Sequence, residues 1–225
     1  SGDAVFSRLS WREEADDLAA LRSRSEAGFD GDTHTILVWR GLSGSTTEAQ
    51  AYDPADGAGF PDGFRIVSDR RPTWSDDGAA VFVGIRTWEA DAGADKDAPE
   101  DDDVEADDPA EVDVWHADDR RIIPMQRVQA ARDRERSLLS VWHLDANRFV
   151  QLGTDLMEEL TLLEGQATVV ARYTDPYTFT NMFGRRWLDL DLIDVETGAR
   201  TKAVERVRHD HGGSATGRYL LYFKD

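Results

Sequence analysis

The sequence contains no cysteine in its 225 residues. It therefore has no disulfide, no thiolate nucleophile and no cysteine-based zinc site. Long apolar runs are also missing: a bilayer-spanning helix needs about 20 apolar residues, and the longest runs here, such as Tyr219–Phe223, are strand-sized. Ser1–Ala4 shows no basic region leading into an apolar stretch, so no targeting peptide is visible. These absences exclude several enzyme classes, predict no membrane span and leave the compartment open.

Bases are scarce relative to acids. Asp and Glu number 45 against 26 Lys and Arg, which gives a formal charge of −19. Binding to a phosphate backbone requires a basic face, so we expect no nucleic-acid partner. The charge is uneven, because the segment from Asp91 to Asp113 holds twelve acids and one base and leaves only −8 for the other 202 residues.

The acidic tract from Asp91 to Glu111 is rich in Asp, Ala and Pro, and Val104 is its only large aliphatic residue. Such a segment cannot bury enough apolar surface to offset its ordering entropy, and its like charges repel. We therefore expect a disordered surface loop. Cation binding is the alternative, but Asp101–Asp103 lacks the glycine turn that calcium loops use.

The rest of the chain is dominated by short runs of branched and aromatic residues separated by turn residues, a composition typical of β-strands. The runs are 36–39, 64–67, 80–85, 138–142, 168–171 and 219–223. They predict an all-β fold. Two segments, Glu13–Arg24 and Pro124–Arg136, also suit helices. The first contains a turn that recurs along the chain, so we assign it to a turn followed by a strand.

This turn, followed each time by a buried strand, is the main repeat of the sequence. It contains glycine in Ser75–Gly78 and Ser214–Gly217, and looser copies begin at Leu9 and Leu162. A second unit, made of a strand, a polar hairpin turn and a return strand, accompanies it around Asn147 and Gly198. Together the two units predict a four-stranded antiparallel meander, which is the blade of a β-propeller.

We predict a partial β-propeller of about three blades plus one strand. The blades are assigned to about Val5–Val67, Pro72–Leu152 and Leu160–Val207, with the acidic loop inside blade two, and the next blade starts at Ser214. Propellers close with about four to eight blades, and an open one leaves edges that recruit partners. We therefore expect the sequence to belong to a longer chain; assembly with a second copy is the alternative.

Three stretches carry a family resemblance. Pro72–Gly78 resembles the Trp-Ser-Pro-Asp-Gly repeat of TolB-type propellers, with Asp76 in place of proline. The stretch from Val112 to Leu144, which contains Trp-His twice and Arg136-Ser137, is similar to the N-terminal propeller of bacterial prolyl oligopeptidase-type serine peptidases. Arg185–Gly198 continues that likeness.

The resemblance implies a non-catalytic propeller that gates peptide access and docks on a C-terminal α/β-hydrolase domain, where the catalytic triad lies. It implies a peptide substrate, no cofactor, and a periplasmic or secreted location ahead of a cytoplasmic one. The alternative is a stand-alone TolB-like module that binds a protein or peptide. A nucleophile elbow needs Gly-x-Ser-x-Gly, and neither Gly41–Ser45 nor Gly212–Gly217 has that spacing. We therefore expect no catalytic residue in this chain.

Arginines are concentrated before the second half of blade two, with six between 120 and 136, interleaved with acids. They either pair locally or face a substrate carboxylate or the domain interface. The residues singled out for the second role are Arg120, Arg121, Arg132, Arg134 and Arg136.

Two further pairs are weighed for binding. Glu158 and Glu159 either hold a substrate ammonium group, as a glutamate pair does in the related dipeptidyl peptidases, or form a surface turn between blades. His209 and His211 share a strand face that a metal could use, but no third ligand is identifiable and the glycines that follow indicate a loop. We expect no metal site.

The sequence also predicts the surroundings of two aspartates and of the tryptophans. Asp189 and Asp191 alternate with leucines, which favours a solvated strand face for both. Large indole rings supply much of the buried area in a blade interface, so the tryptophans are expected to fill inter-blade cores. The six of the seven tryptophans assigned in this way are Trp11, Trp39, Trp74, Trp115, Trp142 and Trp187.

Overall fold

The computed structural model describes residues 5–44, 48–90, 135–156 and 158–224. Several expectations from the sequence fall outside these ranges and stay predictions. They are the acidic loop at 91–111, the helix suggested from Pro124, the position of Trp115, and the positions of Arg120, Arg121, Arg132 and Arg134.

The first sheet is a four-stranded antiparallel meander in the order β1-β2-β3-β4. Its strands are β1 (Phe6–Trp11), β2 (Leu18–Arg24), β3 (Thr33–Trp39) and β4 (Gln50–Tyr52). β2 and β3 pair along their whole length, from Leu18 opposite Trp39 to Arg24 opposite Thr33. The turn-plus-strand interpretation of Glu13–Arg24 is therefore confirmed.

The second sheet contains β5 (Phe64–Val67), β6 (Thr73–Trp74), β7 (Ala80–Thr87), β8 (Leu138–His143) and β9 (Arg148–Gln151). β5 and β6 both pair with β7, so they act as one first strand with an interruption at 68–72. The expected blade boundaries differ here. Val67 lies opposite Gly84 of β7, which places Phe64–Val67 at the start of the second blade instead of the end of the first.

The third sheet runs in the order β10-β11-β12-β13, all antiparallel. Its strands are β10 (Glu159–Leu162), β11 (Thr168–Tyr173), β12 (Leu188–Asp194) and β13 (Arg200–Val207), with a 3-10 turn (Asp175–Tyr177) and α2 (Thr178–Phe183) between β11 and β12. A fourth blade follows as a hairpin of β14 (His209–Gly213) and β15 (Leu220–Phe223). It starts earlier than the predicted Ser214 and has two strands where one was expected.

The same backbone turn joins the first two strands of all four blades. Its first residue donates its N–H to the carbonyl oxygen five residues later, over 2.8–3.0 Å, at Arg12, Ser75, Leu163 and Ser214. The residue three positions later donates back to it in each copy. Gly78 and Gly217 have φ of +72° and +66° in this turn, a backbone region that glycine enters without a Cβ clash. The repeat read from the sequence is thus a repeat of hydrogen bonding, and the fold is a partial all-β propeller.

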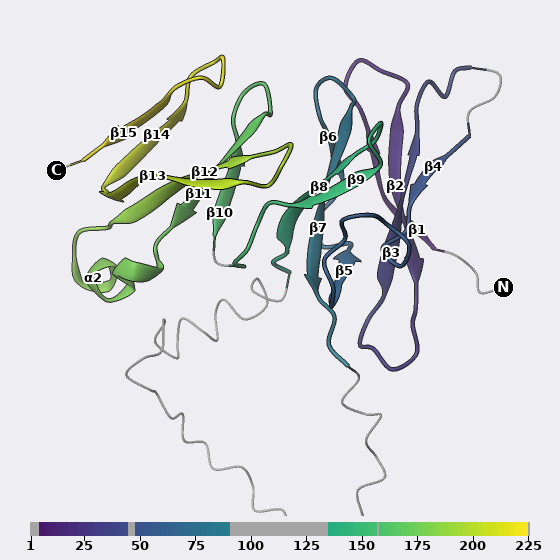
Figure 1. Ribbon diagram of the computed structural model, residues 1–225, viewed down its shortest axis with the longest axis horizontal. Helices are drawn as coiled ribbons and strands as arrows, with labels where there is room; N and C mark the ends of the chain where they lie inside the picture. Colours follow the sequence, from purple (N-terminus) through teal and green to yellow (C-terminus); the bar gives the residue numbers. More distant parts are fainter. Residues whose placement is uncertain (1–4, 45–47, 91–134, 157, 225) are drawn as a thin grey trace, which may run out of the picture.

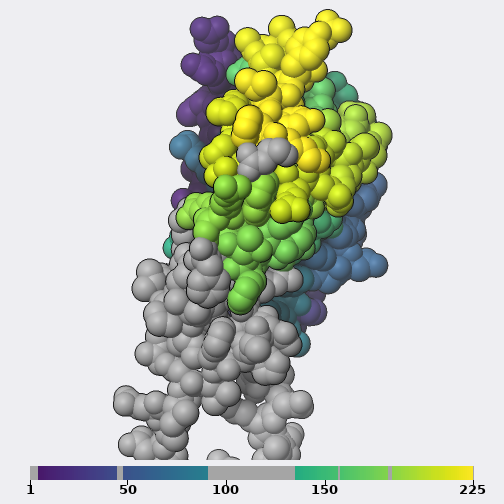
Figure 2. Space-filling view, turned by 90° about the vertical axis from the view of Figure 1, so that its left-hand side faces the viewer, coloured from purple at the N-terminus to yellow at the C-terminus, as the bar shows by residue number. Residues whose placement is uncertain are grey.

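The sheets stand side by side, with these turns at one end and α2 at the other (Figure 1). We call the two ends the turn face and the helix face. The β14–β15 hairpin forms the surface of the molecule beyond the third blade (Figure 2). No helix among the described residues is long and apolar enough to cross a membrane.

The core lies on both sides of β7, which is buried from Ala80 to Ile85. Val81, Val83 and Ile85 belong to a cluster shared with the first sheet, whereas Phe82 faces a cluster shared with the third. A strand buried on both faces has to be apolar throughout, which explains the unbroken run in the sequence.

The tryptophan expectation is confirmed for Trp74 and Trp142, which belong to the cluster shared by the first two sheets. Trp142 packs against Tyr52 across this interface, with 5.5 Å between ring centroids. Trp187 is buried but lies against Arg206, and Trp39 is half-buried. Trp11 contradicts the expectation, because it is 58% exposed on β1, an edge strand.

Candidate functional site

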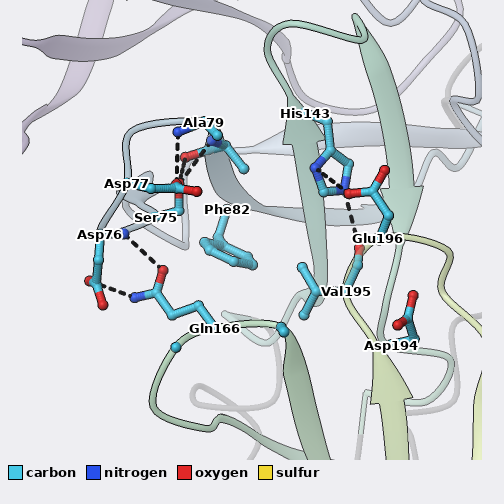
Figure 3. A pocket seen from close by; sticks show the side chains of 13 residues that line it. Ser75, Asp76, Asp77, Ala79, Phe82, His143, Gln166, Asp194, Val195 and Glu196 are labelled. Atoms are coloured by element: carbon cyan, nitrogen blue, oxygen red, sulfur yellow. Dashed lines mark hydrogen bonds and ion pairs between the residues drawn. The ribbon is translucent and has the colours of Figure 1, made fainter. Parts of the chain in front are cut away.

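A cavity of about 450 Å³ opens between the second and third blades on the turn face (Figure 3). Its apolar surface comes from Ala80 and Phe82 of β7 and from Val195 after β12. Its polar lining comes from the turns of the two blades, namely Ser75, Asp76, Asp77, His143, Gln166, Asp194 and Glu196. The cavity therefore combines an apolar wall with four carboxylates.

The Ser75–Gly78 turn fixes one side of this cavity. The hydroxyl of Ser75 donates to Asp77 Oδ1 (2.7 Å) and accepts from the N–H of Ala80 (2.9 Å), and the N–H of Ala79 donates to Asp77 Oδ1 (2.9 Å). The Ser75 and Ala79 hydrogen bonds lower the pKa of the Asp77 carboxyl. Asp77 is thus an ionised part of the turn as well as a lining residue.

The opposite side is built by the hairpin turn of the third blade. Asp194 Oδ1 accepts from the hydroxyl of Thr197 (2.6 Å) and from its N–H (2.7 Å), and these bonds lower the pKa of the Asp194 carboxyl. Glu196 Oε2 lies 3.5 Å from His143 Nδ1 and pairs with Arg148. Since His143 Nε2 is also 3.1 Å from the carbonyl oxygen of Val195, the second and third blades are joined along this wall.

The electrostatics of this cavity limit its ligands. Four lining residues are acidic and one, His143, is basic; Arg148 and Arg12 lie behind the wall, beside Glu196 and Asp76. Such a surface repels an anion and favours a neutral or cationic group with an apolar stem. The sequence predicted the two turns but not that they would face each other across a cavity.

A second cavity of about 330 Å³ also lies between the second and third blades, where residues 135–137 before β8 approach Leu156 and Glu158 at the start of the third blade. Arg136 of the predicted arginine set lines it; the other four fall outside the described residues. Arg136 Nη1 donates to the carbonyl oxygen of Leu156 (3.0 Å), and its own carbonyl oxygen accepts from Arg86 Nε (3.0 Å). Arg136 makes the local contacts of the packing alternative, and a substrate or interface role for the set stays a prediction. Arg70, which no sequence pattern singled out, also lines this second cavity.

Glu158 and Glu159 differ in environment. The Glu158 side chain is 4% exposed and accepts from both terminal nitrogens of Arg200, at 2.6 and 2.9 Å. The surface-turn interpretation is therefore wrong for Glu158, whose buried side chain forms an ion pair between the link after β9 and the first residue of β13. Glu159 is exposed at the start of β10. Only Glu158 lines the second cavity.

The remaining candidates have structural surroundings. His209 and His211 lie on β14, a strand where a loop was expected, with ring centroids 6.4 Å apart. Within the described ranges no three potential metal-binding side chains converge. Asp189 is 5% exposed and accepts hydrogen bonds from Tyr177 Oη (2.6 Å) and the N–H of Arg206 (2.9 Å), so the solvated-face interpretation is wrong for Asp189.

The two serines with elbow-like sequences occupy ordinary turns. Ser214 lies in the turn between the antiparallel strands β14 and β15, and its hydroxyl accepts from the N–H of Tyr219 (3.2 Å). Ser43 follows Gly41 in a turn closed by the Gly44 N–H and the Gly41 carbonyl oxygen (2.9 Å). A nucleophile elbow joins a strand to a helix, and neither serine has that setting.

Solved structures match this chain, whereas family models and curated proteins do not. Among solved structures, the β-propeller domain of the trilobed protease from Pyrococcus furiosus, described as having an open velcro topology, is similar over 98% of this chain. The identity is 10% and the TM-score 0.39, and the chain spans about half, 54%, of that structure.

Proposed function

We propose that this chain is the non-catalytic propeller part of a prolyl oligopeptidase-type serine peptidase, where it screens peptides and docks on an α/β-hydrolase domain. The observation that carries the proposal is where the resembling residues lie in the blades. Trp74–Gly78 forms the first turn of blade two, Val141–Leu144 ends its third strand, and Leu188–Gly198 forms the third strand and hairpin turn of blade three. The family likeness therefore follows the propeller repeat.

The two cavities between the second and third blades fit a role in peptide selection. Each lies beside a blade interface and combines apolar and ionised side chains, which is the mixture that orients a peptide without reacting with it. Ser214 and Ser43 sit in turns between or after strands. The reacting serine is assigned to the hydrolase domain.

A fluorophosphonate probe tests this proposal on the full-length product of the reading frame. We expect one labelled serine, mapped by peptide mass spectrometry to a Gly-x-Ser-x-Gly segment outside these 225 residues. A labelled serine within them would overturn the assignment of catalysis to another domain.

The alternative is a stand-alone TolB-like propeller that binds a protein or peptide. Its distinguishing result is a full-length product that takes up no probe and carries no elbow sequence. That outcome would overturn the peptidase proposal in favour of the binding module.

A further inference from the structure

Strand β7 contains a single glycine, Gly84, in an otherwise large-residue buried run. A Cβ at this position would stand 2.8 Å from the Cβ of Arg70 and would overlap the side chain of Ser137. Glycine inside a strand often marks a place where other groups approach closely. Here the missing side chain lets Arg70 and Ser137 come together at the second cavity, which both residues line.

The Arg70 guanidinium is the one basic group lining this cavity that has no partner among the described residues. Within the described part of the chain, Arg70 makes no hydrogen bond or ion pair, although burial lowers the pKa of its guanidinium. Arg70 is exposed to solvent, so an incoming anion can reach its guanidinium.

Nearby charges do not offset Arg70. Asp69 lies 3.6 Å from Arg86, and Glu158 is held by Arg200. Glu135 is an exposed carboxylate at the rim without a partner among the described residues. Among the described acids that line the cavity, Glu135 is therefore the one that can compete with a ligand for the Arg70 guanidinium.

The surroundings also specify the shape of a ligand. The Ser137 hydroxyl makes no hydrogen bond within the described ranges, so it can donate to a second oxygen of a bound group. Leu156 lines the same cavity and is 38% exposed. Arg86 frames the site, because it bonds the carbonyl oxygen of Arg136 and lies against Asp69. A carboxylate attached to an apolar side chain can pair with Arg70, accept from Ser137 and pack on Leu156.

We propose that the second cavity, lined by Arg70, Ser137 and Leu156, binds a peptide carboxylate next to an apolar side chain. The role of this site in substrate selection rests on the proposed function, whereas the binding of a carboxylate by the site does not. The carboxylate is either the C-terminus of a peptide or an acidic side chain, and both present two oxygens to a guanidinium.

Calorimetric titration of the full-length protein tests the site, with any reactive serine blocked by fluorophosphonate. The probes are N-acetyl-Ala-Leu as the free acid, the same dipeptide as its amide, and N-acetyl-Glu-Leu amide. We expect the free acid to bind at least tenfold more tightly than its amide, since a hydrogen bond to a charged group contributes about 1.5–3 kcal/mol. Tighter binding of the glutamyl amide than of the free acid would instead assign the site to acidic side chains.

Three variants locate the binding. Arg70→Ala should weaken binding of the free acid about tenfold or more, and Glu135→Gln should strengthen it several-fold by removing the competing carboxylate. Arg218→Ala, which removes an exposed arginine on the turn face, should leave binding unchanged.

Equal binding of acid and amide, no binding of either, or an unaffected Arg70→Ala variant would overturn the site. None of these results would change the outcome that we expect from fluorophosphonate labelling. Peptide binding in a protein without a reactive serine would instead overturn the peptidase proposal and keep the site.

Discussion

Asp76 and Gln166 exchange two hydrogen bonds across the interface of the second and third blades. The N–H of Asp76 donates to Gln166 Oε1 (3.0 Å), and Gln166 Nε2 donates to Asp76 Oδ1 (2.9 Å). Arg12 Nη1 of the first blade donates to the carbonyl oxygen of Asp76 (3.3 Å). Equivalent turns of three successive blades are therefore bonded in a row along the turn face.

Replacing Gln166 by Ala should remove both bonds of this exchange and destabilise the protein by about 1 kcal/mol, since each exposed hydrogen bond contributes little net free energy. Asp76→Ala should cost less, because the backbone N–H of residue 76 remains. Urea unfolding of the two single variants and the double variant measures the coupling. Strict additivity of the two effects would show that the side-chain bond from Gln166 Nε2 to Asp76 Oδ1 contributes nothing.

The Glu158–Arg200 pair should make stability depend on pH. Burial alone raises the pKa of Glu158, but the Arg200 hydrogen bonds and charge outweigh it, so the net pKa lies below its usual 4.5. A lowered folded-state pKa means that the pair stabilises the fold above about pH 4.5 and loses this effect as the pH falls through the folded-state pKa. Arg200 responds in the opposite sense, because Glu158 raises its pKa.

Glu158→Gln should therefore cost about 2 kcal/mol at pH 7, since it replaces charge-assisted hydrogen bonds to Arg200, which keeps Asp191 as a second acid partner at 3.4 Å. The difference from the parent protein should shrink below pH 4.5. Glu159→Gln, its exposed neighbour, is the matched control and should change the free energy of unfolding by less than about 0.5 kcal/mol at either pH. A pH-independent cost for Glu158→Gln would contradict the account.

The Tyr177 hydroxyl should lose its proton at a higher pH than an ordinary tyrosine hydroxyl. Desolvation, followed by the hydrogen bond to Asp189, raises the pKa of its hydroxyl from 10.0 to about 12. This group favours the folded state below pH 10, and the effect is lost as the pH rises through about 12. In a tyrosinate absorbance titration, Asp189→Asn should lower this pKa toward 10, while Tyr177→Phe should abolish the step. An unaltered step in Asp189→Asn would mean that the carboxylate does not act on Tyr177.

The blade repeat could be predicted because its determinants are local. A turn such as Ser75–Gly78 is set by residues within five positions of each other, and a strand buried on both faces leaves an unbroken apolar run. The placement of Phe64–Val67 could not be predicted in the same way, because only pairing with β7 decides its sheet. A strand that follows one blade and precedes another has the same composition in either.

Charged side chains were harder to place, because their partners are distant in sequence. Arg200 lies 42 residues from Glu158, and nothing near either residue indicates a buried pair. Asp189 alternates with leucines like a solvated strand residue, yet the connection that contains Tyr177 folds back over it. Arg70 gave no signal either, except that Gly84 interrupts a strand of large residues, which hints at close approach.

The fourth blade should depend on Gly217 more than the third depends on Gly165. Both residues have positive φ, +66° and +78°, so alanine at either position carries a backbone cost of about 1 kcal/mol. At Gly165 an added Cβ meets nothing within 4 Å, whereas at Gly217 it would overlap the carbonyl oxygen of Glu164 in the third blade. Gly217→Ala should therefore separate the β14–β15 turn from the third blade, and Gly165→Ala should not.

Amide hydrogen exchange distinguishes the two variants, because it reports local opening of individual strands. In Gly217→Ala the amides of β14 and β15 should exchange at least tenfold faster than in the parent protein, while those of β7 and β8 keep their protection. In Gly165→Ala the hairpin should retain the parent rates. If both variants left the hairpin equally protected, the contact between Gly217 and Glu164 would not be what holds the fourth blade against the third.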